Sequence, residues 1–158
     1  MTHIPSRCLI LACGNTLRSD DGVGLWLADW AEQRFSNQPG VRVIADHQWT
    51  PELAEDVAHA QSVLFIDCSL DSEPGSLHLT PVKPAASGPE HNTHHLGAAE
   101  LLSLGGALYN SLPREALQLT IGAGSTEIGE KFSAAVTAML PAACRMIEKT
   151  VLRLLSAL

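Results

Sequence analysis

Apolar runs and amphipathic helical patterns alternate along the chain, and this alternation predicts the secondary structure. The segments 8–13 and 62–67 are short, continuous apolar runs, which are typical of strands buried on both faces. A turn at residues 71–75 precedes a segment typical of an edge strand. The predicted strands are residues 8–13, 41–45, 62–67, 76–80 and 116–121.

Helical patterns separate these strands and follow the last one. The predicted helices are residues 22–35, a short helix after Thr50-Pro51, a helix from His94 to Leu104 that ends at Gly105-Gly106, and a long helix that begins near Phe132. Strands that alternate with helices favour a mostly parallel sheet with helices on both faces. We therefore predict an α/β fold, with residues 1–158 forming one three-layer domain.

Residues 81–93 form the longest segment without periodicity. They contain three prolines and lie just upstream of His94. Long irregular loops beside a site are often lids, so we expect this loop to be mobile without substrate and to close when substrate binds.

Composition and charge narrow the class of function. Hydrophobic residues make up 46% and charged residues 17% of the 158 residues, which excludes a disordered chain. The net charge of −7 argues against a nucleic-acid or anionic membrane partner, since both require clustered positive charge. The four cysteines form no CxxC pair and the first residues show no leader pattern, so we expect reduced thiols and a cytoplasmic location.

Candidate chemistry follows the strands. Asp20 and Asp21 come after the first strand, Asp67 ends the third, and His94 and His95 stand at a loop-to-helix junction. Taken singly, the acids could cap a helix or bond loop amides, and the histidines could be surface residues. Ligands of open α/β sheets bind at the carboxyl ends of the strands, where these loops converge. Two carboxylates and an imidazole together are a plausible site for a divalent metal with open coordination positions.

Three motifs in order carry a resemblance to a known family. They are Gly14-Asn15 with Leu17 and Asp20-Asp21-Gly22-Val23-Gly24, then Asp67 at the end of the third strand, then His94-x-Leu96-Gly97. In these motifs the sequence resembles the hydrogenase maturation endopeptidases, and the resemblance spans essentially the whole chain. One departure is segment 47–53, HQWTPEL, where many family members have a glycine-rich stretch.

The resemblance implies an activity and a site. It implies an endopeptidase that removes the C-terminal extension of a nickel-iron hydrogenase large-subunit precursor after nickel insertion. In that family an acid, a second acid and a histidine bind the nickel, and these positions correspond to Asp21, Asp67 and His94. The same three residues are therefore the expected catalytic and metal-binding residues. The nickel would be carried by the precursor, with only weak binding to the free enzyme.

Two routes to attack on the peptide bond are open at this point. An unliganded carboxylate such as Asp20 could act as general base on a water molecule, or the metal could polarise the site. Cys68 is expected to point away from the cleft if Asp67 faces it, because neighbouring residues of a strand point to opposite faces.

Two alternative functions come from other classes of protein. A receiver-type signalling domain also has an acid pair after its first strand, but it needs a lysine after its last strand and residues 122–126 have none. A nucleotide-binding module would use residues 14–24 as a phosphate loop. That segment matches no phosphate-binding pattern, and its two acids would repel a phosphate.

Overall fold

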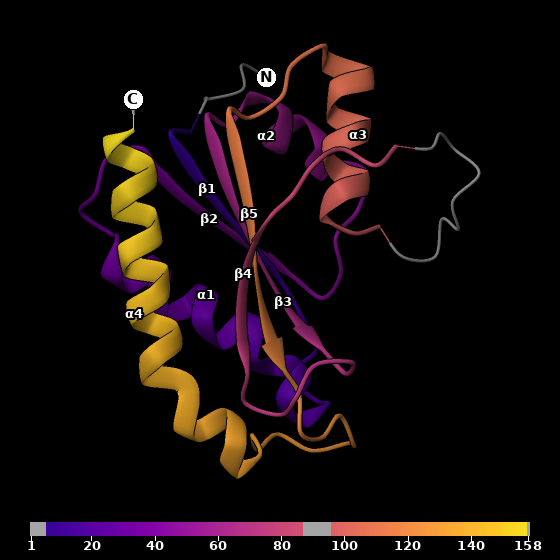
Figure 1. Cartoon of the computed structure of the whole chain (residues 1–158), viewed down its shortest axis with the longest axis vertical. Coiled ribbons are helices and arrows are strands. Elements are labelled where there is room, and N and C mark those ends of the chain that lie inside the picture. Colours follow the sequence, from indigo (N-terminus) through magenta and orange to yellow (C-terminus); the bar gives the residue numbers. More distant parts are fainter. Residues whose placement is uncertain (1–5, 87–95, 158) are drawn as a thin grey trace.

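The computed structural model describes residues 6–86 and 96–157, and within them the predicted strands form one sheet. The order across the sheet is β2-β1-β3-β5-β4, with β4 antiparallel to β5 and the other pairs parallel (Figure 1). The mostly parallel α/β sheet predicted from the sequence is confirmed. The strands are β1 (Cys8–Cys13), β2 (Val41–Asp46), β3 (Ser62–Ser69), β4 (Leu77–Pro81) and β5 (Glu115–Gly122).

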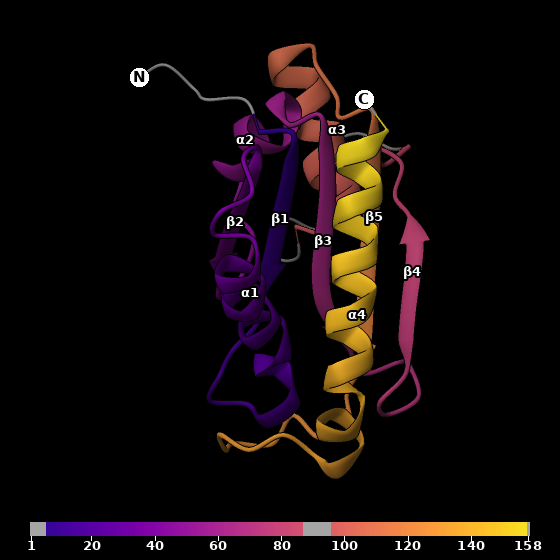
Figure 2. The same ribbon diagram turned by 90° about the vertical axis from the view of Figure 1, so that its left-hand side faces the viewer.

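Helices cover both faces of the sheet, as predicted. Figure 2 looks onto the face covered by α1 and α4, while α2 and α3 pack together on the opposite face. A short 3₁₀ helix, η1, connects β1 to α1. The helices are η1 (Ser19–Gly22), α1 (Val23–Arg34), α2 (Leu53–His59), α3 (Ala98–Tyr109) and α4 (Ala134–Ser156).

Two apolar cores flank the sheet because side chains alternate along each strand. In β1, Ile10 packs toward α1 and α4, whereas Leu9 and Leu11 pack toward α2 and α3. In β3, Leu64 and Phe65 divide between the two cores in the same way. The central strands are therefore buried on both faces, which explains their continuous apolar sequences.

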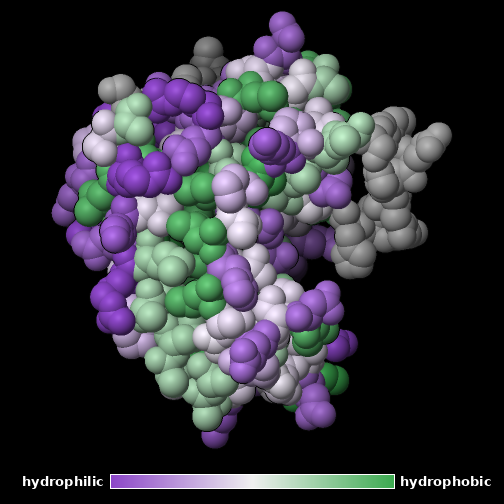
Figure 3. All heavy atoms as spheres, viewed as in Figure 1, coloured by the Kyte–Doolittle hydropathy of each residue, from purple (hydrophilic) through white to green (hydrophobic). Residues whose placement is uncertain are grey.

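The edge strand β4 is only partly covered. Leu77 packs against the core, while Leu79 is 37% exposed. In the view of Figure 3 an apolar band runs over the surface between α4 and β4, flanked by polar residues. The antiparallel β4 beyond β5 also distinguishes the sheet from that of a receiver domain, in which all strands are parallel in the order 2-1-3-4-5.

Helix α3 ends later than the sequence predicts. It continues through Gly105-Gly106 to Tyr109, and Asn110 ends it in the left-handed conformation with φ 50°. Gly105 has a packing role instead, because a Cβ there would lie 3.0 Å from the carbonyl oxygen of Ala54 in α2. The glycine pair marks a close helix contact, and the predicted helix end at this point is wrong.

Two sequence predictions fall partly or wholly outside the described residues. His94 and His95, and with them the predicted start of this helix, lie in the segment 87–95 that the structure does not describe. The predicted lid at residues 81–93 is described only as far as residue 86. No helix of the described residues is long and apolar enough to cross a membrane.

Candidate active site

A cleft of about 590 Å³ opens at the carboxyl ends of β1, β2 and β3. Three strand-end segments and the start of α3 contribute to its wall. The lining residues are Cys13, Gly14 and Asp21 after β1, His47 to Pro51 after β2, Asp67 and Cys68 from β3, and Leu96 and Gly97 before α3. Both predicted carboxylate ligands, Asp21 and Asp67, therefore line one cleft.

Asp21 is held at the cleft by the turn that follows β1. The backbone N–H of Asn15 donates to the Asp21 carboxylate at 3.0 Å and to its carbonyl oxygen at 3.2 Å. Gly14 makes this approach possible, because a Cβ there would lie 2.1 Å from the Asp21 carbonyl oxygen. The Gly-Asn pair thus folds the loop back against the end of β1 and presents the half-buried Asp21 to the cleft.

Asp67 lies at the end of β3 with its carboxylate anchored on one side. Its Oδ1 accepts hydrogen bonds from the backbone N–H of Cys68 at 2.7 Å and from the Cys13 thiol at 3.4 Å. Burial raises the pKa of Asp67, and the negative charge of Asp21 adds to the rise, while the two hydrogen bonds oppose it.

Two neighbouring carboxylates in one half-buried cleft favour cation binding. The negative charge of Asp21 makes ionisation of Asp67 more costly, and a bound cation would relieve that repulsion. Carboxylate oxygens are ligands for divalent metals, so the donor set of Asp21 and Asp67 fits such an ion. Within residues 6–86 and 96–157, no three His, Cys, Asp or Glu side chains form a complete metal site. The third predicted ligand, His94, lies outside these ranges.

Asp20 differs from its neighbour Asp21 in both position and role. It is completely buried, and its carboxylate accepts hydrogen bonds from three backbone N–H groups. These are Gly124 at 2.7 Å, Ser125 at 2.9 Å and Ser133 at 2.7 Å. Burial alone would raise the pKa of Asp20, but the hydrogen bonds outweigh it and hold this pKa below its usual value.

The general-base role suggested for Asp20 is therefore wrong. Its side chain has no access to water in the cleft and its oxygens already bind amides. Asp20 instead connects η1 to the segment between β5 and α4, and so fixes the loop that carries Asp21. The contacts span 104 to 113 residues of sequence, so no local pattern could have indicated them.

The two cysteines of the cleft are poor nucleophiles. Cys68 packs on the α1 and α4 side of the sheet, as strand alternation predicts, yet it also lines the cleft, which opens beyond the strand ends. The prediction that it points away from the cleft is therefore wrong. Burial and then the charges of Asp21 and Asp67 raise the pKa of Cys68 to about 12. The pKa of Cys13 is also raised, chiefly by burial, so both thiols stay protonated near neutral pH.

Known structures share this arrangement of strands and helices. No family model and no curated protein matches the chain. The hydrogenase maturating endopeptidase HybD from E. coli superposes with a TM-score of 0.75 at 20% identity, over 93% of both chains. The chain has the fold of the hydrogenase maturation endopeptidases.

Two archaeal structures support the same conclusion about this endopeptidase fold. The [NiFe] hydrogenase maturation protease HybD from Thermococcus kodakarensis has a TM-score of 0.65 at 25% identity, covering 91% of this chain and 98% of that one. HycI from Thermococcus kodakarensis KOD1 has a TM-score of 0.66 at 23% identity, covering 96% and 93%. The resemblance carried by the sequence motifs is thus confirmed at the level of the fold.

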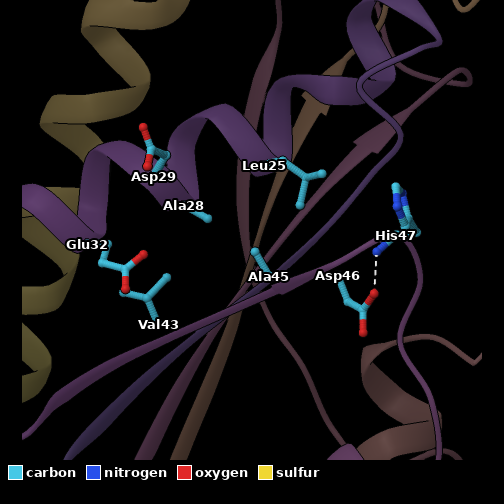
Figure 4. A pocket seen from close by; sticks show the side chains of 8 residues that line it. All are labelled: Leu25, Ala28, Asp29, Glu32, Val43, Ala45, Asp46 and His47. Atoms are coloured by element: carbon cyan, nitrogen blue, oxygen red, sulfur yellow. Dashed lines mark hydrogen bonds between the residues drawn. The ribbon is translucent and has the colours of Figure 1, made fainter.

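Two cleft residues of this endopeptidase fold were missed by the sequence interpretation. His47 is not among the predicted site residues, but it follows β2 and borders the cleft. It also borders a smaller hollow of about 350 Å³ between α1 and β2, and its backbone N–H donates to Asp46 at 2.8 Å (Figure 4). Trp49 lies nearby in the cleft wall. The sequence could have indicated both residues, because they follow β2, which also ends at the carboxyl edge of the sheet.

Proposed function

We propose that the chain is an endopeptidase that removes the C-terminal extension of a nickel-iron hydrogenase large-subunit precursor once nickel is in place. The observation that carries this proposal is the meeting of Asp21 and Asp67 in one cleft, at the carboxyl edge of a sheet with the endopeptidase fold. The four free cysteines support action in the cytoplasm, where thiols stay reduced.

In this proposal nickel belongs to the substrate. Asp21, Asp67 and His94 contact the ion that the precursor's own cysteines hold, and the enzyme thereby recognises a loaded precursor. Three ligands without a thiolate make a weak nickel site, so the free enzyme binds the ion only weakly. Contact with the substrate-bound ion also relieves the repulsion between the two carboxylates.

We propose that water attacks the peptide bond. Asp20 is sealed in the interior and the thiols of Cys13 and Cys68 are protonated, so none of these groups is suited to the attack. The carboxylates of Asp21 and Asp67 line the cleft, so a carboxylate oxygen that does not hold the ion can accept the proton from water.

The test compares cleavage of nickel-loaded and nickel-free precursor by the purified chain. Only the loaded precursor should be processed. Asp21→Asn, Asp67→Asn and His94→Ala should each lower kcat/KM by roughly 100-fold or more, since each removes a contact made to the bound ion. The matched control is Asp29→Asn, an exposed acid on α1 outside the cleft, which should cleave normally.

The outcomes separate the parts of the proposal. Equal cleavage of loaded and nickel-free precursor would contradict nickel recognition while leaving the protease activity in place. Absence of any cleavage by the unaltered chain would contradict the activity itself. Complete loss of cleavage in a folded Cys68→Ser variant would show that a thiol is the attacking group.

A further inference from the structure

Large apolar side chains are exposed at the end of the molecule that carries the cleft. Leu17 in the β1–η1 turn is 58% exposed, Trp26 of α1 is 42% exposed and Ile128 in the β5–α4 loop is 87% exposed. Single exposed apolar residues are common, but a group of them at one place usually serves binding. We name Leu17, Trp26, Ile128 and the half-buried Phe132 the rim patch.

Backbone contacts bring the members of the rim patch together. The carbonyl oxygen of Leu17 accepts a hydrogen bond from the N–H of Gly129 at 2.9 Å, which places Ile128 beside the β1–η1 turn. Trp26 and Phe132 line one hollow of about 250 Å³, and residues of the same turn complete its wall. Figure 1 and Figure 2 both show the turn and the β5–α4 loop at the same end of the molecule.

One turn lies between the rim patch and the cleft. Within it, Asp21 lines the cleft, whereas Thr16 and Gly22 line the hollow beside Trp26. Asn15 connects the two sides of this turn. Its backbone N–H donates to the Asp21 carboxylate, and its side-chain oxygen accepts a hydrogen bond from the next-but-one N–H at 2.9 Å. A protein that brings an ion to Asp21 therefore comes close to the rim patch as well.

The proposed function indicates which protein this is. The precursor's own cysteines hold the ion that Asp21 contacts, so the folded body of the precursor must approach the turn together with its extension. A second copy of the chain on the patch would obstruct that approach. An anionic membrane is disfavoured by the net charge of −7 and by Glu127 and Glu130, which flank Ile128 in the sequence.

We propose that the rim patch docks the folded body of the precursor, with a large apolar side chain of that body bound in the hollow lined by Trp26 and Phe132. The inference rests on the proposed function and adds an interaction surface to it. Aromatic side chains that become buried at the centre of an interface contribute much of its binding energy. Leu17 and Ile128 extend the apolar contact along the turn and the loop.

The first test places a charge on the patch with Leu17→Lys and, separately, Ile128→Lys. With nickel-loaded precursor, KM should rise about 10-fold in each variant while kcat stays within about 2-fold, because docking serves binding. Both side chains are exposed, so Tm should stay unchanged. The matched control is Leu108→Lys in the last turn of α3, since Leu108 is 61% exposed and lies outside the cleft lining. Its KM should not change.

The second test identifies what covers the patch. The photo-cross-linking residue p-benzoylphenylalanine is placed at position 128, and at position 108 as the control, and each protein is irradiated with nickel-loaded precursor. Cross-links from position 128 should map to the folded body of the precursor, and position 108 should give none. Mass spectrometry of the cross-linked peptides distinguishes the body, the C-terminal extension and a second copy of the chain.

Each result decides the inference. An unchanged KM in both lysine variants, or no cross-link to the precursor from position 128, would overturn the docking surface and leave the proposed protease intact. Cross-links to the extension alone, or to a second copy of the chain, would also overturn it, because another partner would then cover the patch. Failure of the unaltered chain to cleave any precursor would overturn the proposed function, and with it the basis for this assignment.

Discussion

Asp20 and Asp21 are adjacent in sequence, yet their surroundings give them opposite properties. The Asp20 carboxylate is sealed in the interior by three amides, whereas Asp21 faces the cleft and its carboxylate accepts one amide hydrogen bond, from Asn15. The difference arises at η1, where the short helix turns one side chain inward and the next toward the cleft. Residue type alone does not decide the role of an acid, because the number of amides around it also matters.

The ionised Asp67 carboxylate is expected to lower the stability of the fold while it supports precursor cleavage. Its pKa is raised in the folded protein, so ionisation of this acid costs stability once the pH exceeds the unfolded pKa of about 3.9. Asp67→Asn removes that cost and keeps an oxygen for the Cys68 amide. At pH 7 its Tm should therefore rise by about 1–4 °C while precursor cleavage is lost.

Thermal unfolding at pH 7 and pH 3 checks the prediction for Asp67. The gain in Tm should shrink at the lower pH, where the native carboxyl is itself protonated. A Tm that falls at pH 7 would show that the charged form of Asp67 stabilises the fold. Asp29→Asn is again the control, because this exposed acid lies outside the cleft.

The sequence predicts a site residue where the position of that residue follows from the strand or helix next to it. Asp21 and Asp67 could be predicted because both follow strands, and strand ends meet at one edge of a parallel sheet. The partners of Asp20 could not, since they come from the other end of the chain. Trp49 belongs to the apolar core, so its sequence alone does not distinguish it from an ordinary core residue, and only the structure shows that it also lines the cleft.

At the scale of elements, α1 begins in unusually tight contact with β1. A Cβ at Gly24, the second residue of α1, would lie 2.4 Å from the carbonyl oxygen of Cys13. This contact involves backbone on one side, so it cannot be relieved by a side-chain rotation. The glycine lets the helix start directly against the end of the strand, which places η1 and Asp21 beside the cleft.

Gly24→Ala should therefore push α1 away from the sheet. We expect a loss of about 1–3 kcal/mol in the free energy of unfolding, as in other overpacked sites. Precursor cleavage should fall as well, because Asp21 moves with the helix. Chemical denaturation and the cleavage assay measure the two effects.

The matched control for Gly24 is a glycine inside a helix with flexible surroundings. A Cβ at Gly106 of α3 would lie 3.2 Å from the end of the Leu112 side chain, which can shift. Gly106→Ala should change stability by less than about 1 kcal/mol, with helix propensity in its favour. Equal losses in the two variants would contradict the packing explanation for Gly24.

Elements were predicted better than their boundaries. The five strands were found because buried strands and amphipathic helices have different apolar periods. The end of α3 was predicted too early, because a glycine pair occurs in two structural settings. It can end a helix, or it can admit another helix, and only the approach of α2 to Gly105 shows which applies.

At the scale of the whole molecule, Asp20 joins two segments that are more than 100 residues apart in the sequence. Its lowered pKa means that the ionised form stabilises the folded protein. This contribution is complete above the unfolded pKa of about 3.9 and is lost as the pH falls toward the lower folded pKa. The acid stability of the molecule therefore depends in part on this carboxylate.

Asp20→Ala should destabilise the protein strongly at neutral pH. Three buried amides would lose their acceptor, and we expect a loss of about 3–5 kcal/mol in the free energy of unfolding at pH 7. The difference from the unaltered chain should narrow below about pH 4, where the Asp20 carboxyl of the unfolded chain takes up a proton while the native carboxylate is still ionised. Urea unfolding across this pH range measures the effect, and a difference that stays constant with pH would contradict the role of its charge.

The three amides that bind Asp20 have a further consequence for motion. Gly124 and Ser125 follow β5, and Ser133 caps α4, yet all three donate to one carboxylate. Their amide hydrogens are thus released to solvent by a single opening event rather than three separate ones. Any motion that swings η1 outward must also free the first turn of α4. The loop that carries Asp21 therefore cannot open independently of α4. Opening of the cleft at this loop is coupled to the N-terminal turn of α4.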